Sequence, residues 1–248
     1  MKDVTDHIAI VTGGTRGIGA AIVKRLAARG AAVVANSISE EAAETFADGL
    51  RAEGLRVVAA CGDVADETDV ARIFEICRQT FGPCSLLVNN AGYEQRVAFD
   101  SLSVADWDRM INVHLRGTFL CCRTAITDML AAGDGVIVNV ASRIGQAGGA
   151  NVCHYAAAKA GMIGLTKSLA REFSRRGIRV NAVAPGPIKT EISAAFAPGW
   201  EEERLKELPL GRFGEPDDVA DTVEFLASPR SRLYVGQTFG LNSGGLMV

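Results

Sequence analysis

Short apolar runs rich in β-branched residues alternate with segments of helical period along almost the whole chain. Continuously apolar runs of this length are typical of strands in a sheet that is covered on both faces. Strands separated by helices imply right-handed crossovers and a parallel sheet. We therefore expect an α/β fold with a doubly wound, seven-stranded parallel sheet and helices on both faces. The predicted strands lie at 7–12, 32–36, 57–61, 86–89, 136–140, 180–184 and 238–241.

Two connecting segments, 17–29 and 66–81, place apolar residues at the spacing of an amphipathic helix. No linker, repeat or low-complexity tract interrupts the pattern, so the 248 residues are expected to form a single domain. Segment 190–207 differs, because Phe196 and Trp200 stand among charges without a clear period. Ligands of such folds bind at the carboxyl ends of the strands, and we expect this segment to form a substrate lid there.

The composition argues against several classes of function. With 26 Lys and Arg against 29 Asp and Glu, the net charge of −3 gives no electrostatic reason to expect nucleic acid or an anionic membrane as partner. No apolar run reaches the roughly 18 residues of a membrane span, and the start lacks the apolar core of a secretory signal. The six cysteines show no Cys-x-x-Cys spacing and are expected to be free thiols. These features predict a cytoplasmic protein.

A glycine-rich turn, TGGTRGIG at 12–19, follows the first predicted strand and opens the first predicted helix. Gly13 can take a tight turn, Gly17 lets a phosphate approach the backbone, and Gly19 allows close helix packing. The free N–H groups of the helix N-terminus suit a pyrophosphate. The glycines alone also fit a plain strand-to-helix turn, but their position favours a dinucleotide site. The residues expected to bind the dinucleotide here are Gly13, Thr15, Arg16, Gly17, Ile18 and Gly19.

The end of the second predicted strand bears on the choice of cofactor. Sites that prefer NAD usually hold the adenosine ribose with a carboxylate here, whereas this chain has Asn36 and Ser37, and its first acid is Glu40. Arg16 either faces a 2′-phosphate or is a solvated loop residue. The pattern favours NADP(H), with NAD(H) as the alternative.

Asp63 and Val64 follow the third predicted strand at the same edge of the sheet. The Asp63 carboxylate can accept a hydrogen bond from an adenine amino group. It can equally cap the helix predicted at 66–81. Either role fits the sequence.

Tyr155 and Lys159 stand four residues apart, so on a helix both side chains project from one face. A cation beside a phenol favours the phenolate and lowers its pKa, which gives a proton donor and acceptor near neutral pH. The same spacing also occurs on solvated helices without any function. Other motifs have to decide between these readings.

With these motifs in view, the chain resembles the short-chain dehydrogenase/reductase superfamily nearly end to end, most closely its 3-oxoacyl-[acyl-carrier-protein] reductases. The resemblance implies a Rossmann-type fold and an enzyme that transfers a hydride between NAD(P)(H) and a carbonyl or secondary alcohol carbon. It is carried by the glycine turn at 12–19, NNAG at 89–92, Ser142 with Tyr155 and Lys159, and the segment from Pro185 and Gly186 to Thr190.

The resemblance also implies roles for individual residues. Tyr155 would be the general acid in reduction and the general base in oxidation, with Lys159 lowering its pKa and binding the nicotinamide ribose. Ser142 would hydrogen-bond the substrate oxygen. Asn112 would hold a water chain to Lys159, or it would only mark a helix kink. Further cofactor contacts would come from Asn90, Ala91, Gly92, Pro185, Gly186, Ile188 and Thr190.

The substrate is less constrained. A 3-oxoacyl-type carbonyl reductase is the first expectation, a sugar or polyol dehydrogenase the second, and a non-catalytic dinucleotide sensor a third of another class. An acidic acyl carrier protein would need a basic docking surface, which the turn at 131–134 does not offer and which Arg175 and Arg176 supply only in part. Besides Ser142 and Tyr155, the expected substrate residues are Tyr93, Glu94, Gln95, Ile144, Gln146, Phe196 and Trp200.

Two further expectations concern metals and assembly. His114 and His154 flank these motifs without the spacing of metal ligands, so both are expected to be structural and no metal is expected. The predicted helix at 155–171 is rich in alanine and glycine. In the family such helices pair across subunits, which implies a homotetramer built as a dimer of dimers.

Overall fold

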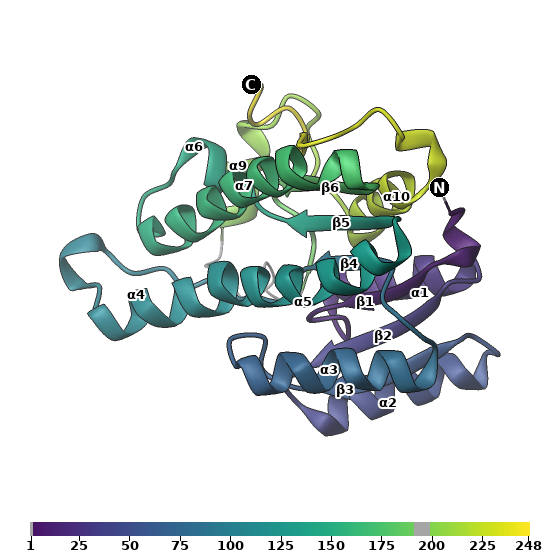
Figure 1. The fold of residues 1–248 in the computed structure, drawn as a ribbon. Helices are drawn as coiled ribbons and strands as arrows, with labels where there is room; N and C mark the ends of the chain where they lie inside the picture. Colours follow the sequence, from purple (N-terminus) through teal and green to yellow (C-terminus); the bar gives the residue numbers. More distant parts are fainter. Residues whose placement is uncertain (1, 191–198) are drawn as a thin grey trace.

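The computed structural model describes residues 2–190 and 199–248, which fold around one seven-stranded sheet (Figure 1). All neighbouring strands are parallel, in the order β3-β2-β1-β4-β5-β6-β7. The predicted fold is confirmed, and every predicted strand end lies within two residues of the observed one. The strands are β1 (Ile8–Val11), β2 (Ala32–Ser37), β3 (Val57–Cys61), β4 (Leu86–Asn89), β5 (Gly135–Val140), β6 (Ile178–Pro185) and β7 (Thr238–Leu241).

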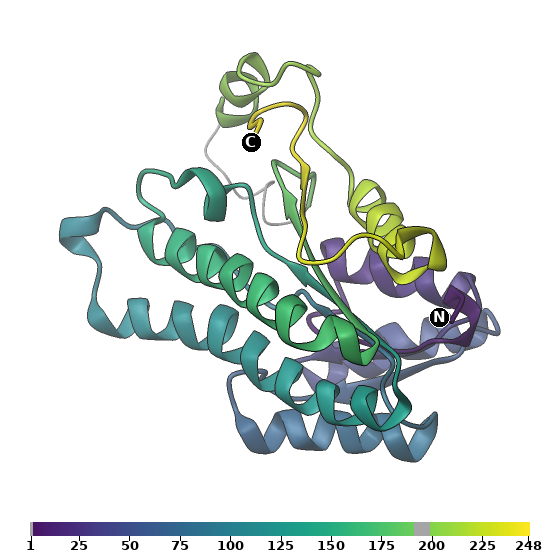
Figure 2. The same ribbon diagram turned by 45° about the horizontal axis from the view of Figure 1, so that its top comes forward.

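Helices cover both faces of the sheet, because each strand buries side chains on both sides. On β1, Ala9 and Val11 enter one core while Ile10 enters the other. The first core is closed by α1 (Gly17–Ala28), α2 (Glu40–Ala52) and α10 (Pro216–Ala227). The second is closed by α3 (Glu67–Thr80), α5 (Gly117–Ala132) and α7 (Cys153–Phe173), which lie side by side in Figure 2. Shorter helices are α4 (Val104–Ile111), α6 (Ile144–Ala147) and α9 (Trp200–Lys206).

The sheet changes its winding direction between β1 and β4, which are neighbours in space although β2 and β3 intervene in the sequence. Loops that leave the two strands there go to opposite faces of the sheet and leave a crevice at the carboxyl ends. The glycine turn after β1 and the NNAG segment after β4 both open into this crevice. In the described residues, no helix has the length and apolar character of a membrane span.

A buried chain of polar side chains fixes α7 against the sheet. Asn89 Nδ2 on β4 donates to Asn139 Oδ1 on β5 at 2.8 Å, and Asn139 Nδ2 donates to Thr166 Oγ1 on α7 at 2.8 Å. Thr166 donates in turn to the carbonyl oxygen of Met162. Buried networks of this kind specify one arrangement, because breaking one bond leaves the others unsatisfied. The network therefore sets the position of the helix that carries Tyr155 and Lys159.

Candidate active site

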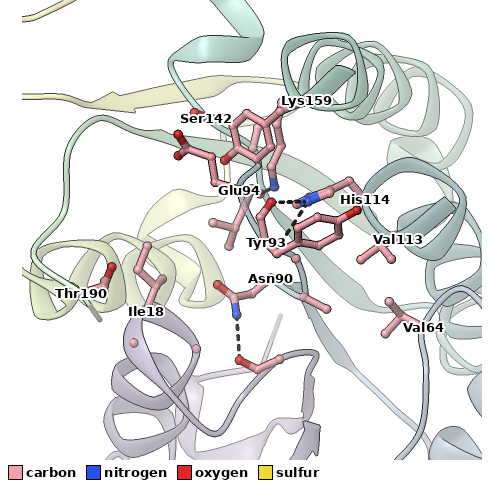
Figure 3. A pocket seen from close by; sticks show the side chains of 18 of the residues that line it. Ile18, Val64, Asn90, Tyr93, Glu94, Val113, His114, Ser142, Lys159 and Thr190 are labelled. Atoms are coloured by element: carbon pink, nitrogen blue, oxygen red, sulfur yellow. Dashed lines mark hydrogen bonds between the residues drawn. The ribbon is translucent and has the colours of Figure 1, made fainter. Parts of the chain in front are cut away.

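A cavity of about 820 Å³ lies at the carboxyl ends of the strands, and Figure 3 shows side chains that line it. The loops after β1 to β6 all contribute to its wall. Every residue predicted to bind the cofactor lines it, as do Ser142, Asn112 and the Tyr155–Lys159 pair. The cavity thus joins motifs that are spread over most of the sequence.

The glycine turn adopts the backbone that the sequence predicts. Gly13 and Gly17 have positive φ values of 59° and 50°. A Cβ on Gly19 would overlap the Gly13 carbonyl oxygen and lie 2.6 Å from Asn90 Nδ2, so only glycine fits there. No side chain caps the N-terminus of α1 at Arg16, which leaves its first N–H groups directed at the cavity. This is the arrangement that binds a pyrophosphate.

The NNAG segment holds the glycine turn in place. Asn90 Nδ2 donates to the carbonyl oxygens of Thr12 and Gly13, both at 3.0 Å. The backbone N–H groups of Asn90 and Ala91 donate to Thr12 Oγ1, also at 3.0 Å. In Figure 3, Asn90 lies between the glycine turn and the cluster around Tyr93. The segment therefore joins the cofactor half of the cavity to the half that contains Tyr155.

Asn36, at the end of β2, hydrogen-bonds the backbone through its side chain. The Asn36 amide donates to the carbonyl oxygens of Ala60 and Gly62, and its oxygen accepts from Gly13 N–H at 3.3 Å. Asn36 thus lines the cavity with its polar atoms already bonded to the backbone.

The predicted capping role of Asp63 is wrong. Asp66 is the N-cap of α3 and accepts from the N–H groups of Thr68 and Asp69. Asp63 Oδ1 accepts from Ala65 N–H at 2.9 Å in the preceding turn. The Asp63 carboxylate, which lines the cavity, therefore stays available to a ligand through its second oxygen.

Ser142, Tyr155 and Lys159 meet at the other end of the cavity. Lys159 Nζ donates to the carbonyl oxygen of Val140 at 2.7 Å and lies 5.7 Å from the centre of the Tyr155 ring. Ser142 Oγ accepts from Ile144 N–H at 3.1 Å, which fixes the hydroxyl at the end of β5. Lys159 is only 3% exposed, so its ammonium depends on the few polar partners that reach it.

Burial controls the pKa values of this pair. It raises the pKa of Tyr155 to about 12, against the lowering effect of a hydrogen bond with Ser142. It also lowers the pKa of Lys159 to about 7. The lowering of the Tyr155 pKa by Lys159, expected from the sequence, does not appear among the protein groups. The physical reason is that removal from water acts on both groups, while the ammonium is bonded to Val140 O.

Asn112 begins a π-helical segment, Asn112–Arg116, between α4 and α5. The Gly117 N–H donates to the Asn112 carbonyl oxygen in the wider π turn. Such insertions are frequent at functional sites because they re-aim the side chains of a helix. Here the insertion brings Asn112, Val113 and His114 to the cavity wall.

His114 has a closer relation to the site than the sequence indicates. Its ring meets the Tyr155 ring edge-on at 5.3 Å, and its Nε2 donates to the Tyr93 carbonyl oxygen at 2.9 Å. A Cβ on Gly92 would lie 2.6 Å from His114 Nδ1, so the glycine of the NNAG segment makes room for this ring. The expectation of a structural His114 agrees with this packing behind Tyr155.

The stability of the protein is expected to depend on His114 below neutral pH. Burial lowers the pKa of His114 to about 3, whereas an unfolded histidine takes up a proton near 6.5. Stability is therefore lost as the pH falls from about 6.5 towards 3. H114F fills similar space without titrating and should show a smaller loss in urea unfolding between about pH 6 and pH 4. An equal loss in both proteins would mean that His114 is already charged in the fold.

Of the residues predicted to contact the substrate, Tyr93, Glu94, Ile144 and Trp200 line the cavity. Among the described residues, Gln146 is not one of those that line it. Its backbone N–H is bonded one turn back, to Arg143 O, within the α6 turn. Gln95 also points elsewhere and donates to Asp106 Oδ1. Phe196 lies outside the described residues, as does the part of the predicted lid from 191 to 198, whereas Trp200 and Arg204 of α9 line the cavity.

Comparisons with known proteins agree with this geometry. Residues 7–199 match the family model for short chain dehydrogenases. The chain is 40% identical to the 3-oxoacyl-[acyl-carrier-protein] reductase FabG of Staphylococcus aureus over 96% of this chain and 98% of that protein. It is 41% identical to cis-4-hydroxycyclohexanecarboxylate dehydrogenase of Sinomonas cyclohexanicum over 96% of each.

A solved structure of a related protein has the same fold. An inferred gluconate dehydrogenase of Agrobacterium tumefaciens superposes with a TM-score of 0.95 at 31% identity, covering 99% of this chain and 98% of that one. That structure therefore shares the fold of this chain over nearly its whole length. In this fold the glycine turn and Tyr155 line the same cavity. The chain belongs to the short chain dehydrogenase family and is an NAD(P)-dependent oxidoreductase acting on carbonyl or alcohol groups.

Proposed function

We propose that this enzyme transfers a hydride between NADP(H) and a carbonyl or secondary alcohol carbon held beside Tyr155, in the manner of a 3-oxoacyl reductase. The observation that carries the proposal is the meeting of Ser142, Tyr155 and Lys159 in one cavity with the glycine turn. In reduction the carbonyl carbon has to receive a hydride and the carbonyl oxygen a proton. A cofactor bound at the glycine turn would extend into the cavity that contains the Tyr155 hydroxyl. A panel of carbonyls and alcohols, assayed with both nicotinamide cofactors, tests it. Absence of turnover across the panel would favour a dinucleotide sensor.

In reduction, the Ser142 hydroxyl would hydrogen-bond the carbonyl oxygen and the Tyr155 phenol would give that oxygen its proton as the carbon gains the hydride. In oxidation the proton returns to the Tyr155 oxygen. When bound, the cofactor supplies the hydride and, in its oxidised form, a positive charge that opposes the effect of burial on the Tyr155 pKa. Lys159, held by Val140 O, would pass protons between Tyr155 and water at Asn112.

The preference for NADP(H) rests on the charges at the adenine end. Arg16 is exposed at the start of α1 and lines the cavity. The end of β2 contributes Asn36, Ser37 and Ile38 to the wall, and Glu40 is not among the described residues that line it. A guanidinium without an opposing carboxylate suits a 2′-phosphate.

Arg16→Ala is expected to weaken NADPH binding by about 10-fold and to leave NADH binding within about twofold, because only the charged contact to the 2′-phosphate is lost. Titration of cofactor fluorescence measures both affinities. Arg212→Ala, an exposed arginine outside the cavity, is the matched control. Tighter binding of NADH than NADPH by the unchanged protein would contradict the assignment.

Two substrate classes deserve testing first. A 3-oxoacyl thioester is favoured by the likeness to the Staphylococcus aureus reductase, whose carrier-bound substrates would make acyl carrier protein a partner. A sugar or hydroxy acid is favoured by charged side chains at the substrate end, including Glu94, Arg96 and Arg143. The names of two relatives also refer to hydroxy acids, gluconate and 4-hydroxycyclohexanecarboxylate.

We also propose a cytoplasmic homotetramer. All six cysteines are free, as expected in a reducing compartment. Gly164 of α7 has open space around its Cα, and Leu233, Met247 and Val248 expose 86%, 77% and 92% of their surfaces. A subunit contact would cover such groups. Sedimentation equilibrium is expected to give four chains per particle, and a monomer would contradict this.

A further inference from the structure

The substrate end of the cavity has more positive than negative charge. Four arginines line it there: Arg96, Arg109, Arg143 and Arg204. Arg109 lies 5.7 Å from the centre of the Tyr93 ring. Arg96 forms an ion pair with Glu94 at 2.8 Å, and Arg204 forms one with Glu207. Arg96 and Arg204 also lie 5.9 Å from the centre of the Trp200 ring. These two guanidinium groups are thus paired with carboxylates of the chain itself.

Arg143 differs from Arg96 and Arg204, because no carboxylate among residues 2–190 and 199–248 lies within ion-pair distance of it. Its backbone is fixed, because its N–H donates to Pro185 O at 3.0 Å and its carbonyl oxygen accepts from Gln146 and Ala147. The guanidinium is half-buried, and burial lowers its pKa; Arg204 adds to the effect, while Glu207 and Glu94 oppose it. A partly buried cation without an ion pair is costly. A bound anion would offset that cost.

The position of Arg143 beside Ser142 indicates where such an anion would bind. Arg143 directly follows Ser142, and adjacent Cα atoms are about 3.8 Å apart. An arginine side chain reaching into the same cavity can therefore contact a group a few bonds away from the oxygen held by Ser142. Glu94 lines the same region and is already bonded to Arg96, so it does not repel an anion as a free carboxylate would.

We propose that Arg143 binds a carboxylate of the substrate, so that the enzyme acts on oxo acids or hydroxy acids in which the carboxylate lies within a few bonds of the reacting carbon. The inference rests on the proposed function, since it takes Ser142 and Tyr155 as the groups that hold the reacting oxygen. Next to Ser142, Arg143 supplies one guanidinium without an ion pair in the described part of the chain, and this matches the single charge of a carboxylate. A phosphate, with a charge of about −1.5 to −2, would leave excess negative charge beside Glu94.

The test compares matched pairs of substrates. Oxo acids such as 3-oxobutanoate and 4-oxocyclohexanecarboxylate are each assayed beside the neutral methyl ester, with a neutral 3-oxobutanoyl thioester and a phosphorylated ketone as further arms. The unchanged enzyme should prefer each acid to its ester in kcat/KM. Arg143→Gln should lower kcat/KM for the acids by about 10- to 100-fold, mainly through KM, and change the esters by less than about threefold. Arg143→Lys should restore part of the loss, and Arg56→Gln, an exposed arginine outside the cavity, should change neither.

The outcomes separate the inference from the proposed function. Turnover of esters or the thioester as efficient as that of acids would overturn the carboxylate site and leave carbonyl reduction standing. A stronger preference for the phosphorylated ketone, lost in Arg143→Gln, would overturn the carboxylate in favour of a phosphate. Equal losses on acids and esters in Arg143→Gln would mean that Arg143 only positions Ser142, which also overturns it. An enzyme that reduces no carbonyl would overturn both proposals.

Discussion

Tyr155→Phe is expected to lower kcat by about 10²- to 10⁴-fold, which is the usual contribution of a positioned proton donor. The substitution removes one oxygen and keeps the ring, so the edge-on contact with His114 at 5.3 Å is preserved. Cofactor affinity should stay nearly unchanged, because the glycine turn and Lys159 are not altered. Steady-state kinetics and a cofactor titration on the same preparation measure the two quantities.

The matched control is Tyr234→Phe. Tyr234 lies outside the cavity and makes edge contacts with the rings of Phe225 and Phe239, with 5.4 Å between ring centres in each pair. Its variant should retain the turnover of the unchanged enzyme. If Tyr155→Phe also retained it, the proton would have to come from another group and the assignment of Tyr155 would be wrong.

Gly19→Ala is expected to weaken binding of both nicotinamide cofactors by about 10- to 100-fold, the equivalent of a typical overpacking cost. The added methyl group would overlap the Gly13 carbonyl oxygen and approach Asn90 Nδ2 to 2.6 Å. Either α1 or the glycine turn has to shift, and both carry the N–H groups that would hold the pyrophosphate. Equilibrium titration with NADPH and NADH measures the loss.

Gly49→Ala separates this effect from a general response to adding a methyl group to a helical glycine. Gly49 lies within α2, and nothing comes within 4 Å of a Cβ built there. Its substitution should leave cofactor affinity unchanged and raise the free energy of unfolding by about 0.5–1 kcal/mol, because alanine loses less backbone entropy than glycine. Unchanged cofactor affinity in Gly19→Ala would show that the phosphates are held elsewhere.

The fold could be predicted from the sequence because its strands are buried on both faces. Run 57–61 is apolar throughout and run 86–89 is apolar up to Asn89, and the predicted bounds match β3 and β4. The ends of strands depend on backbone pairing as well as on residue type. In β6, Ile178 and Arg179 extend the strand beyond the predicted 180–184, because they pair with Gly135 and Val136 of β5.

Side-chain direction was the part that the sequence could not supply. Gln146 is polar and close to Ser142 in the chain, but the short α6 turn separates it from the cavity wall. The sequence allows Asp63 to bind a ligand or to be the N-cap of the following helix. The N-cap of α3 is Asp66, three residues later, because its side chain reaches the first N–H groups of that helix. Both outcomes depend on local turns rather than on residue type.

The surroundings of Tyr155 were also hidden from the sequence. The π-helical segment at Asn112–Arg116 changes the direction of His114, and no spacing in the sequence marks such an insertion. The one available signal was Gly92, since a glycine before a bulky ring can indicate close packing; here a Cβ would meet His114. The sequence also does not indicate that Arg143 lacks an ion pair within the described residues. This becomes visible only in the structure, where Arg96 and Arg204 pair with Glu94 and Glu207.

The central claim is that hydride reaches a carbonyl carbon in the cavity that contains Tyr155. It is tested most directly with NADPH deuterated at nicotinamide C4, prepared separately with the label on each face, and an oxo acid as acceptor. Mass spectrometry of the alcohol should find the deuterium on the carbinol carbon from one of the two labelled cofactors, at a rate that Tyr155→Phe reduces in proportion to kcat. An alcohol free of deuterium from both cofactors, or no alcohol at all, would contradict the account.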